Sequence, residues 1–317
     1  MSWTDASGAT LRYARPVPAP SAAHLRRIRR SLLAWYDAEH RDFPWRGERD
    51  PYAVLVSEVM LQQTQAARVA ERFPRFLARF PTAATLAAAS PASALAEWSG
   101  LGYNRRALAL QRTAAAVTRD GWPSDVAGLE RLAGIGPYTA RAIASLAFGL
   151  PAGVVDTNVR RWLLRRFGGR DARRPLQELA DALATAEADG RAADWTHATM
   201  EFGATVCRSR SPRCETCPIA RGCPSSRVAA TIPAPRQAAL RGSSRAYRGA
   251  IVRLLSTSAG HALPEARLRA RIEAESREIG PALADEAWSR VLGGLERDGL
   301  VRRADRVVRL GPATIEA

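Results

Sequence analysis

The stretch Leu132-Ala133-Gly134-Ile135-Gly136 separates two segments with a helical pattern, 126–132 and 138–147. Gly134 and Gly136 allow a tight turn there, because glycine adopts backbone angles that other residues avoid. Bare backbone N–H groups at the start of the following helix can hold a DNA phosphate. The stretch indicates a helix-hairpin-helix that binds DNA, and an ordinary glycine-rich connection is the alternative.

Helical patterns continue on both sides of this hairpin. Apolar residues recur at helical spacing, and Pro or Gly residues separate the segments. The further helical segments are 24–39, 52–64, 66–79, 92–98, 104–119, 157–166, 175–187 and 193–206. Strand-like alternation is absent from residues 1–225. The sequence therefore predicts an all-α domain over 23–225, preceded by a flexible arm over 1–22 that is rich in Pro, Ala and Ser.

A second unit follows a linker predicted over 226–243, which is also rich in Pro, Ala and Ser. Helices are expected at 245–256, 264–276 and 284–298. A strand pair is expected at 300–302 and 307–310, with Asp305 at the turn. Three helices and a short strand pair predict a small winged-helix-like α+β module over 244–317.

The charge of the chain favours a polyanionic partner. The 317 residues carry a net charge of +16 and a sequence pI near 11.1, and each basic group near a phosphate releases a condensed counterion. All 47 basic residues are arginine, so no side-chain amine can form a Schiff base. Neither a long apolar run nor a secretory signal is found, and a cytoplasmic, nucleoid-associated protein is expected.

Four cysteines lie close together in the spacing C-x6-C-x2-C-x5-C: Cys207, Cys214, Cys217 and Cys223. Four thiolates at compact spacing can bind an iron–sulfur cluster or a tetrahedral zinc ion. Such clustering in a cytoplasmic protein argues for a metal, and a disulfide knot is the remaining alternative.

Two acidic residues stand in apolar surroundings. Glu58 interrupts an apolar helical segment, and Asp156 follows an apolar stretch at a predicted helix start. Paired carboxyl groups can perform acid–base chemistry. Taken singly, Glu58 could be a charge on the wet side of its helix, and Asp156 could be a helix N-cap.

Together these features resemble the MutY adenine DNA glycosylases of the helix-hairpin-helix superfamily. The resemblance covers about residues 24–225, and five segments besides the cysteine spacing carry it. They are Phe43-Pro44-Trp45-Arg46, Ser57 to Gln65 (SEVMLQQTQ), Gly100-Leu101-Gly102-Tyr103, Gly134 to Ala140 (GIGPYTA) and Val155-Asp156-Thr157-Asn158-Val159. The resemblance implies a two-lobed glycosylase fold with a [4Fe–4S] cluster in the loop 207–223.

The resemblance also implies catalytic roles. Glu58 would be the general acid that protonates the adenine. Asp156 would stabilise the oxocarbenium-like sugar or bond to it transiently. Tyr138 and Asn158 stand where the family places residues that orient this carboxylate and the attacking water. Thr157 departs from the family, which commonly has glycine there, as do Ala133 and Asn104.

Contacts with the DNA follow from the same resemblance. Trp45, Arg46 and Arg41 would line one side of the base pocket, and His197, with Met200, the other side. Gln62 would wedge into the duplex and Tyr103 would stack on the opposite strand. The alternatives are core packing for Trp45 and Met200 and an exposed helix histidine for His197.

The resemblance implies a monofunctional glycosylase that excises adenine mispaired with 8-oxoguanine or guanine. Relatives that nick the strand, such as endonuclease III, have a lysine where this chain has Tyr138. Double-stranded DNA with a mismatch is the expected partner of a monomer, with no membrane and no small-molecule substrate. Alternatives are a thymine or uracil mismatch glycosylase of the same superfamily and a non-catalytic DNA-damage-binding protein. The C-terminal region is too short and too helical for the Nudix-like domain of many relatives.

Overall fold

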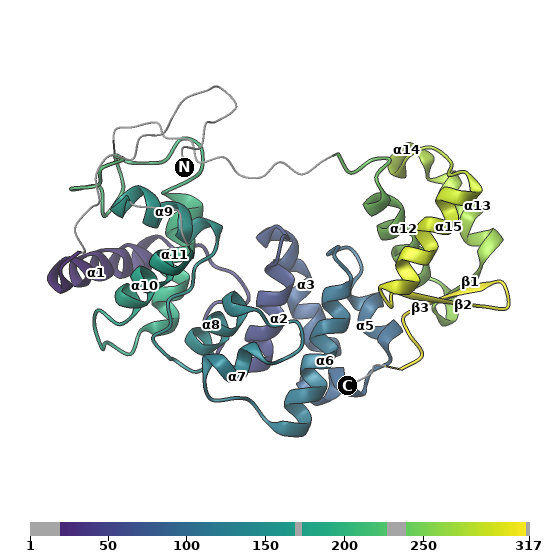
Figure 1. Ribbon diagram of the computed structural model, residues 1–317, viewed down its shortest axis with the longest axis horizontal. Helices are drawn as coiled ribbons and strands as arrows, with labels where there is room; N and C mark the ends of the chain where they lie inside the picture. Colours follow the sequence, from purple (N-terminus) through teal and green to yellow (C-terminus); the bar gives the residue numbers. More distant parts are fainter. Residues whose placement is uncertain (1–19, 169–172, 227–238, 315–317) are drawn as a thin grey trace. The chain divides into compact units, whose positions relative to one another are not determined.

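The computed structural model describes residues 20–168, 173–226 and 239–314. The chain divides into two compact units (Figure 1). Unit 1 consists of Met1–Asp42 and Ala140–Pro235, and unit 2 consists of Phe43–Thr139 and Arg236–Ala317. Most of the predicted arm and linker lies outside the described residues. The division groups the C-terminal module with the helices that precede the hairpin.

Helices are the only regular secondary structure among the described residues of unit 1. Its helices are α1 (Ala22–Glu39), most of α8 (Pro137–Leu146), α9 (Thr157–Phe167), α10 (Arg173–Ala184) and α11 (Ala192–Thr205). Their apolar faces meet in one core, in which Trp162 lies edge-on to Phe202 with ring centroids 5.9 Å apart. The all-α prediction is confirmed here, and α1, α9 and α11 begin within two residues of the predicted starts.

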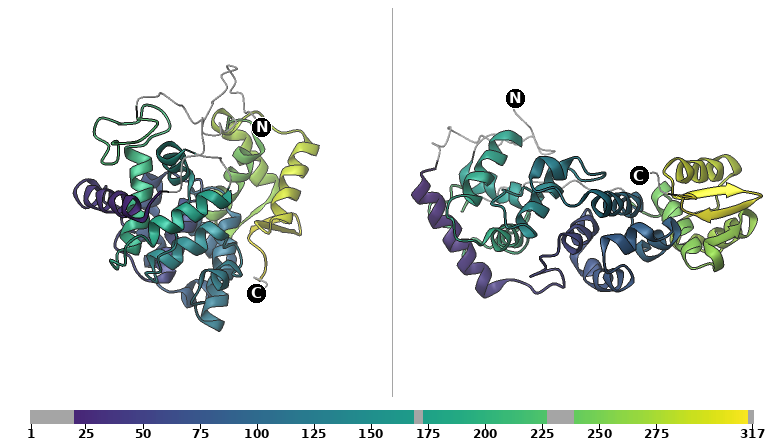
Figure 2. Two further views of the ribbon diagram at one scale, coloured as in Figure 1. Left: turned by 60° about the vertical axis from the view of Figure 1, so that its left-hand side comes forward. Right: turned by 90° about the horizontal axis from the view of Figure 1, so that it is seen from below.

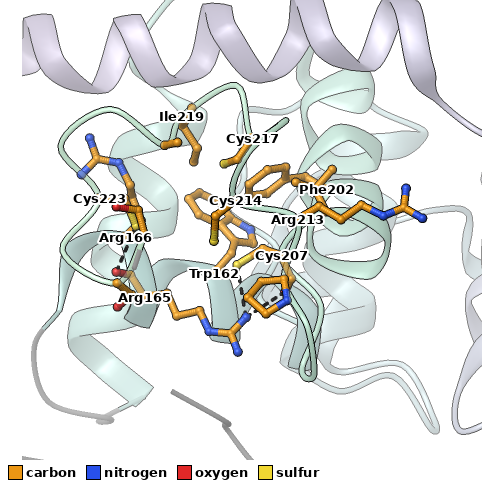
Figure 3. A pocket seen from close by; sticks show the side chains of 15 residues that line it. Trp162, Arg165, Arg166, Phe202, Cys207, Arg213, Cys214, Cys217, Ile219 and Cys223 are labelled. Carbon is orange, nitrogen blue, oxygen red and sulfur yellow. Dashed lines mark hydrogen bonds between the residues drawn. The ribbon is translucent and has the colours of Figure 1, made fainter. Parts of the chain in front are cut away.

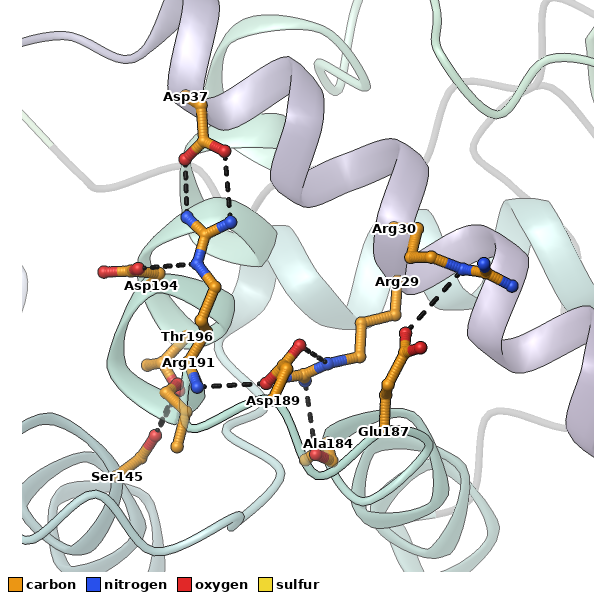
Figure 4. A network of polar contacts seen from close by, with 11 residues as sticks. Arg29, Arg30, Asp37, Ser145, Ala184, Glu187, Asp189, Arg191, Asp194 and Thr196 are labelled. Atoms are coloured by element: carbon orange, nitrogen blue, oxygen red, sulfur yellow. Dashed lines mark hydrogen bonds and ion pairs between the residues drawn. The ribbon is translucent and has the colours of Figure 1, made fainter.

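A buried ion network holds α1 to the segment between α10 and α11 (Figure 4). Arg29 is 1% exposed and donates two hydrogen bonds, of 2.9 and 2.6 Å, to the Asp189 carboxylate and one to the Ala184 carbonyl. These hydrogen bonds lower the pKa of Asp189. Arg191 binds Asp37 of α1 and Asp194 of α11. Because every charge has a partner, burial of Arg29 is compatible with a stable core.

The first part of unit 2 contains α2 (Pro51–Leu61), α3 (Ala66–Arg79), α4 (Ala83–Ala88), α5 (Pro91–Trp98), α6 (Arg105–Asp120), α7 (Val126–Glu130) and the start of α8. α2 is buried continuously from Tyr52 to Met60, as expected for a helix that is apolar all round. It ends at Leu61, so the prediction of helix over 62–64 is wrong. α4, which the predicted segments omitted, begins with a capping box at Thr82.

The C-terminal module contains α12 (Ser244–Ser256), a 3-10 turn (Ala259–His261), β1 (Ala262–Pro264), α13 (Glu265–Ala274), α14 (Ser276–Ile279), α15 (Asp285–Arg297), β2 (Val301–Ala304) and β3 (Val307–Leu310). The strands form an antiparallel sheet in the order β1-β3-β2. The yellow strands β2 and β3 lie side by side in Figure 2. The predicted helices and strand pair are confirmed. β1 was not predicted, because three residues are too few to show an alternating pattern.

The module is docked on α5 and α6 within unit 2. α12 and β3 pack against α5, and Arg105 of α6 lies 3.5 Å from Asp298. Gly311 has φ +73°, and a Cβ built on it would lie 3.1 Å from the Ala92 nitrogen and from Pro91 Cβ. The backbone after β3 therefore touches the start of α5 directly. Among the described residues, no helix has the length and apolar character needed to cross a membrane.

This docking predicts a difference between two glycine substitutions. Gly121 also has a positive φ but no neighbour within 4 Å of a built Cβ. Backbone strain costs about 1–3 kcal/mol at either position. Gly311→Ala adds overpacking against α5, which costs about 1–3 kcal/mol more. Urea unfolding should therefore show a larger loss of unfolding free energy for Gly311→Ala than for Gly121→Ala, and equal losses would contradict the docking.

Candidate active site

Asp156 is the N-cap of α9 and a half-buried hydrogen-bond acceptor. One carboxylate oxygen accepts the backbone N–H of Val159 at 2.6 Å, and the other accepts Nδ2 of Asn158 at 2.7 Å. The N-cap prediction for Asp156 is confirmed, and the predicted partner Asn158 does touch the carboxylate. A carboxylate at a helix N-terminus is also favoured by the helix dipole. The N-cap geometry therefore fixes the orientation of the Asp156 carboxylate.

The charge state of Asp156 results from opposed influences. Burial is the largest of them, and it raises the pKa of Asp156 above that of an ordinary aspartate. The hydrogen bonds from Val159 and Asn158 and the positive charge of Arg161 act in the other direction. All the donors stabilise the ionised form. Asp156 is thus a desolvated carboxyl group whose anion has dedicated partners.

The segment that leads to Asp156 is pressed onto α10. A Cβ built on Gly153 would lie 2.4 Å from the carbonyl carbon of Ala180, so only glycine fits there. The Gly153 N–H donates to Asp181 at 2.9 Å, and Arg141 of α8 donates to the same carboxylate oxygen at 2.6 Å. The approach of the chain to the N-cap is therefore fixed on both sides.

Arg161 connects the Asp156 carboxylate to the cysteine loop. Its Nη2 donates to Oδ1 of Asn158 at 2.9 Å and to the Gly203 carbonyl at 2.5 Å, and its Nε donates to the Cys207 carbonyl at 2.8 Å. Gly203 has no room for a side chain, because a built Cβ would lie 2.7 Å from the Asn158 carbonyl oxygen. The motifs analysed above did not include Arg161. Its spacing of three from Asn158 places both on one face of α9.

The four cysteines line one pocket in the loop that follows α11 (Figure 3). Apolar side chains of unit 1 complete its wall, among them Trp162, Phe202 and Ile219. All four thiols are free, so the disulfide alternative is wrong. The described residues contain no group of three or more His, Cys, Asp or Glu side chains close enough together to hold a single metal ion. Four thiols around an apolar pocket suit a cluster larger than one ion.

Arginines of α9 hold the backbone of this loop. Arg165 donates to the carbonyls of Arg208 and Ser209 at 2.5 and 3.1 Å, and to Sγ of Cys207 at 3.5 Å. Arg166 donates to the Gly222 carbonyl at 3.0 Å. Guanidinium groups beside sulfur would offset the negative charge of bound thiolates. The loop is thus positioned from one helix at both of its ends.

Glu58 lies in the middle of α2 and is 3% exposed. The alternative that it is a charge on the wet side of its helix is therefore wrong. Glu58 belongs to unit 2, and Asp156 belongs to unit 1.

The hairpin has the predicted turn. α7 ends at Glu130, α8 begins at Pro137, and Gly134 between them has φ +78°. A Cβ built on Gly134 would lie 2.7 Å from Ala109 Cβ, so glycine is required for packing as well as for the turn. Gly134 and Gly136 are exposed, which leaves their backbone open to a ligand. Tyr138 is half-buried in the first turn of α8.

Gln62 and Tyr103 lie in two loops of unusual backbone geometry. Gln62 is the C-cap of α2 and donates to Thr139 at 3.3 Å. The next residue, Gln63, has φ +55°, and Tyr103 has φ +47°. Such angles are uncommon outside glycine and cost free energy. Tyr103 is 42% exposed, unlike most large apolar side chains of the protein.

Arg106 ties these two loops together. Its Nη1 donates to the carbonyls of Val59 and Gln62, both at 2.6 Å, and its Nη2 donates to the Gly102 carbonyl at 3.0 Å. The guanidinium lies over the Tyr103 ring, 5.4 Å from its centroid. Burial lowers the pKa of Arg106 to about 10, so it stays charged at neutral pH. One fixed cation therefore satisfies the end of α2 and the loop before α6.

Among the residues predicted to line the base pocket, Trp45 and Met200 pack in a core, and Arg46 lies over an aromatic ring. Trp45 is 6% exposed, stacked on Phe43 and edge-on to Phe73, so core packing is confirmed for it. Met200 likewise packs against the unit 1 core. Arg46 lies over the Phe43 ring at 5.7 Å.

Arg41 forms two hydrogen bonds, of 2.5 and 3.1 Å, with the carboxylate of Glu201 in α11. Glu201 was not predicted, although its spacing of four from His197 places both on one helix face. Burial of a carboxylate is costly unless it is paired, and Arg41 supplies the pairing charge. His197 is buried, so the exposed-helix alternative is wrong.

Comparisons with known proteins agree with this geometry. Residues 56–185 match the HhH-GPD superfamily of base excision DNA repair proteins. An adenine DNA glycosylase of Mycobacterium tuberculosis (strain ATCC 25618 / H37Rv) is 46% identical over 211 residues, which cover 64% of this chain and 69% of that protein. An adenine DNA glycosylase of Mycolicibacterium smegmatis is 42% identical over 238 residues, which cover 72% of this chain and 80% of that protein.

A solved structure shows the same arrangement of helices. A thermostable thymine-DNA glycosylase matches with a TM-score of 0.60 and 30% sequence identity, and the match covers 65% of this chain and 99% of that one. The helix-hairpin-helix, the cysteine loop and the extent of the alignments lead to one assignment. The chain belongs to the HhH-GPD superfamily of base excision DNA repair proteins, and within it to the family of the adenine DNA glycosylases.

Proposed function

We propose that the protein hydrolyses the N-glycosidic bond of adenine mispaired with 8-oxoguanine or guanine in double-stranded DNA. One observation carries the proposal: a desolvated carboxylate, Asp156, is held at the start of α9 by Val159 and Asn158. The net charge of +16 favours binding to a polyanion such as DNA. The resemblance to adenine DNA glycosylases supplies the substrate.

Two carboxyl groups divide the chemistry in this proposal. Glu58 donates a proton to the adenine, so the bond between the base and the sugar breaks with the electron pair on the base. Asp156 stabilises the positive charge that develops on the sugar. Water then adds to that sugar and gives up a proton to the Glu58 carboxylate, which restores the acid. Tyr138 and Asn158 orient the carboxylate and the water. Opposed charge states of two carboxyl groups allow this reaction at neutral pH.

Strand cleavage is not part of the proposed reaction. A lyase step needs an amine that forms an imine with the opened sugar. The chain has no lysine, and position 138 is a tyrosine. The products are therefore free adenine and an intact strand with an abasic site.

The proposed cofactor is a [4Fe–4S] cluster held by Cys207, Cys214, Cys217 and Cys223. The four free thiols around a pocket with apolar walls support this assignment. When bound, such a cluster would link the four thiolates and so hold the loop 207–223 in one conformation. Arg161 would extend this order to Asn158, because it binds the carbonyl of Cys207.

The remaining site residues are proposed to handle the DNA. Gln62 fills the gap left by the extruded adenine, and Tyr103 stacks beside it. The residues proposed to bind the base and the backbone are Arg41, Trp45, Arg46, His197, Gly134 and Gly136. We propose that the protein acts on mismatched DNA as a monomer.

Two other functions are kept as outcomes of the test. The structural similarity to a thymine-DNA glycosylase favours a thymine or uracil mismatch glycosylase as the second candidate. The other is a DNA-damage-binding protein without activity, which the burial of Glu58 and Asp156 argues against.

Base release from duplexes with A:8-oxoguanine, A:G, T:G and U:G pairs tests the substrate. Adenine should be released from the first two, and strand nicking should require added alkali because the chain has no lysine. Release of thymine or uracil without adenine would replace adenine by the second candidate. Binding without release of any base would leave only the non-catalytic function.

Asp156→Asn tests the catalytic carboxylate. The substitution keeps a side chain that can cap α9 but removes the negative charge, so single-turnover excision should fall by roughly 10³-fold or more while DNA binding survives. Asp125→Asn is the matched control, because Asp125 caps α7 by accepting the Gly128 N–H. An unchanged excision rate in Asp156→Asn would refute the mechanism.

Arg161→Gln tests the bridge between the cysteine loop and Asn158. Loss of the Arg161 guanidinium should displace Asn158 and, with it, the Asp156 carboxylate. Displacement of a catalytic group by an ångström can lower the rate about 100-fold. Single-turnover excision and iron content should be measured together for Arg161→Gln and Arg161→Lys. Excision should fall in both variants, because a lysine keeps the charge but not the fork. Full activity of Arg161→Lys would show that only the charge is needed.

A further inference from the structure

Two arginines face each other across the sheet of the C-terminal module. Arg302 of β2 is aligned with Arg309 of β3, and both are exposed. Side chains in such directly opposite positions lie close together, and like charges there are destabilising. Val301, Val308 and Leu310 point to the opposite, buried side. The outer face of the sheet thus concentrates positive charge at a cost in folding free energy.

No carboxylate among the described residues of the module pairs with Arg302 or Arg309. Arg302 donates only to the Gly311 carbonyl, at 3.4 Å, and Arg303 points the other way, to Glu296 of α15. Arg306 adds a third exposed cation at the turn between the strands. Within the described part of the chain, none of Arg302, Arg306 and Arg309 forms an ion pair. We call these three residues the wing face.

We infer that the wing face binds the phosphate backbone of duplex DNA, at a second site apart from the hairpin. Arginine presents a planar fork that matches phosphate oxygens, and binding would remove the repulsion between Arg302 and Arg309. Their neighbours Ala262 and Ala304 are small, so a backbone can approach closely. The inference rests on the proposed function for the identity of the ligand only.

The contact is made by the sheet and not by α15. Helices that read bases present their N-terminal residues to the groove. Here that end of α15 carries two exposed acids: Asp285, which is paired with Arg269, and Glu286, whose charge would repel phosphate. The wing face therefore adds affinity that is independent of sequence. Because the module is docked on α5, this second contact keeps a fixed place within unit 2.

Salt-dependent DNA binding tests the inference. The double variant Arg302→Gln/Arg309→Gln removes two proposed phosphate contacts, so the slope of log affinity against log salt should fall by about 2. Arg271→Gln/Arg277→Gln is the matched control, since these exposed arginines lie on α13 and α14 and make the same change in charge. Fluorescence anisotropy with an unmodified duplex measures both slopes without any excision.

Thermal unfolding separates a binding role from a structural one. Loss of the like-charge pair should leave the unfolding midpoint of the wing variant unchanged or raise it, while DNA affinity falls. Arg302→Lys/Arg309→Lys should retain most of the salt slope, because the charges remain. Hydroxyl-radical footprints of the wild type should include protection that the wing variant lacks.

Two results would overturn the inference. The first is an unchanged slope in the wing variant, which would leave the wing face to a ligand other than duplex DNA. The second is an equal fall in the control, which would show a general effect of net charge. Neither depends on which base is excised. Absence of excision by a wild-type protein that shows the expected slopes would count against the proposed function alone.

Discussion

The guanidinium of Arg161 is the contact on which the arrangement of unit 1 depends. It joins the side chain of Asn158 to the backbone at Gly203 and Cys207, and so joins the N-cap of α9 to the loop of thiols. Glycine at 203 lets α11 approach α9 closely enough for the fork to reach both. Asp156 can then remain a well-oriented acceptor, because its donors cannot turn away from it. The order of the cysteine loop and that of the carboxylate are therefore parts of one structure.

Unit 2 solves a similar problem with Arg106. Two loops with strained backbone angles need donors for their carbonyl groups, and one fork serves the end of α2 and the turn before α6. An ammonium group could not replace it, because its three donors radiate from a single point. Strain at Gln63 and Tyr103 is tolerated because several hydrogen bonds to Arg106 oppose its release. Gln62 and Tyr103, the residues proposed to enter the duplex, lie beside the Arg106 guanidinium.

Local sequence patterns predicted most of the helices and strands but few of the contacts between residues far apart in the sequence. The hydrogen bond between the side chains of Asp156 and Asn158 joins residues two positions apart, and the turn at Gly134 depends on that glycine alone. Both could therefore be expected from the sequence. Arg161 and Cys207 are 46 residues apart, and Arg41 and Glu201 are 160 apart. Such contacts appear only once helices are packed. The burial of Glu58 and His197 could not be predicted before the helices were packed, because a single polar residue in an apolar helix is compatible with either a core or a surface position. β1 and α4 were too short for their periodicity to show.

The exclusive use of arginine has a consequence for control. A lysine can lose its charge by acetylation, but an arginine keeps its charge at any physiological pH. The forks at 106 and 161 and the cations of the sheet are thus permanent features of the fold. Acyltransferases that modify lysine find no side-chain amine in this chain. Acetylation of side chains therefore cannot weaken its binding to a nucleic acid. For a DNA-binding protein of this kind, salt concentration and not acetylation would tune the contacts with phosphate.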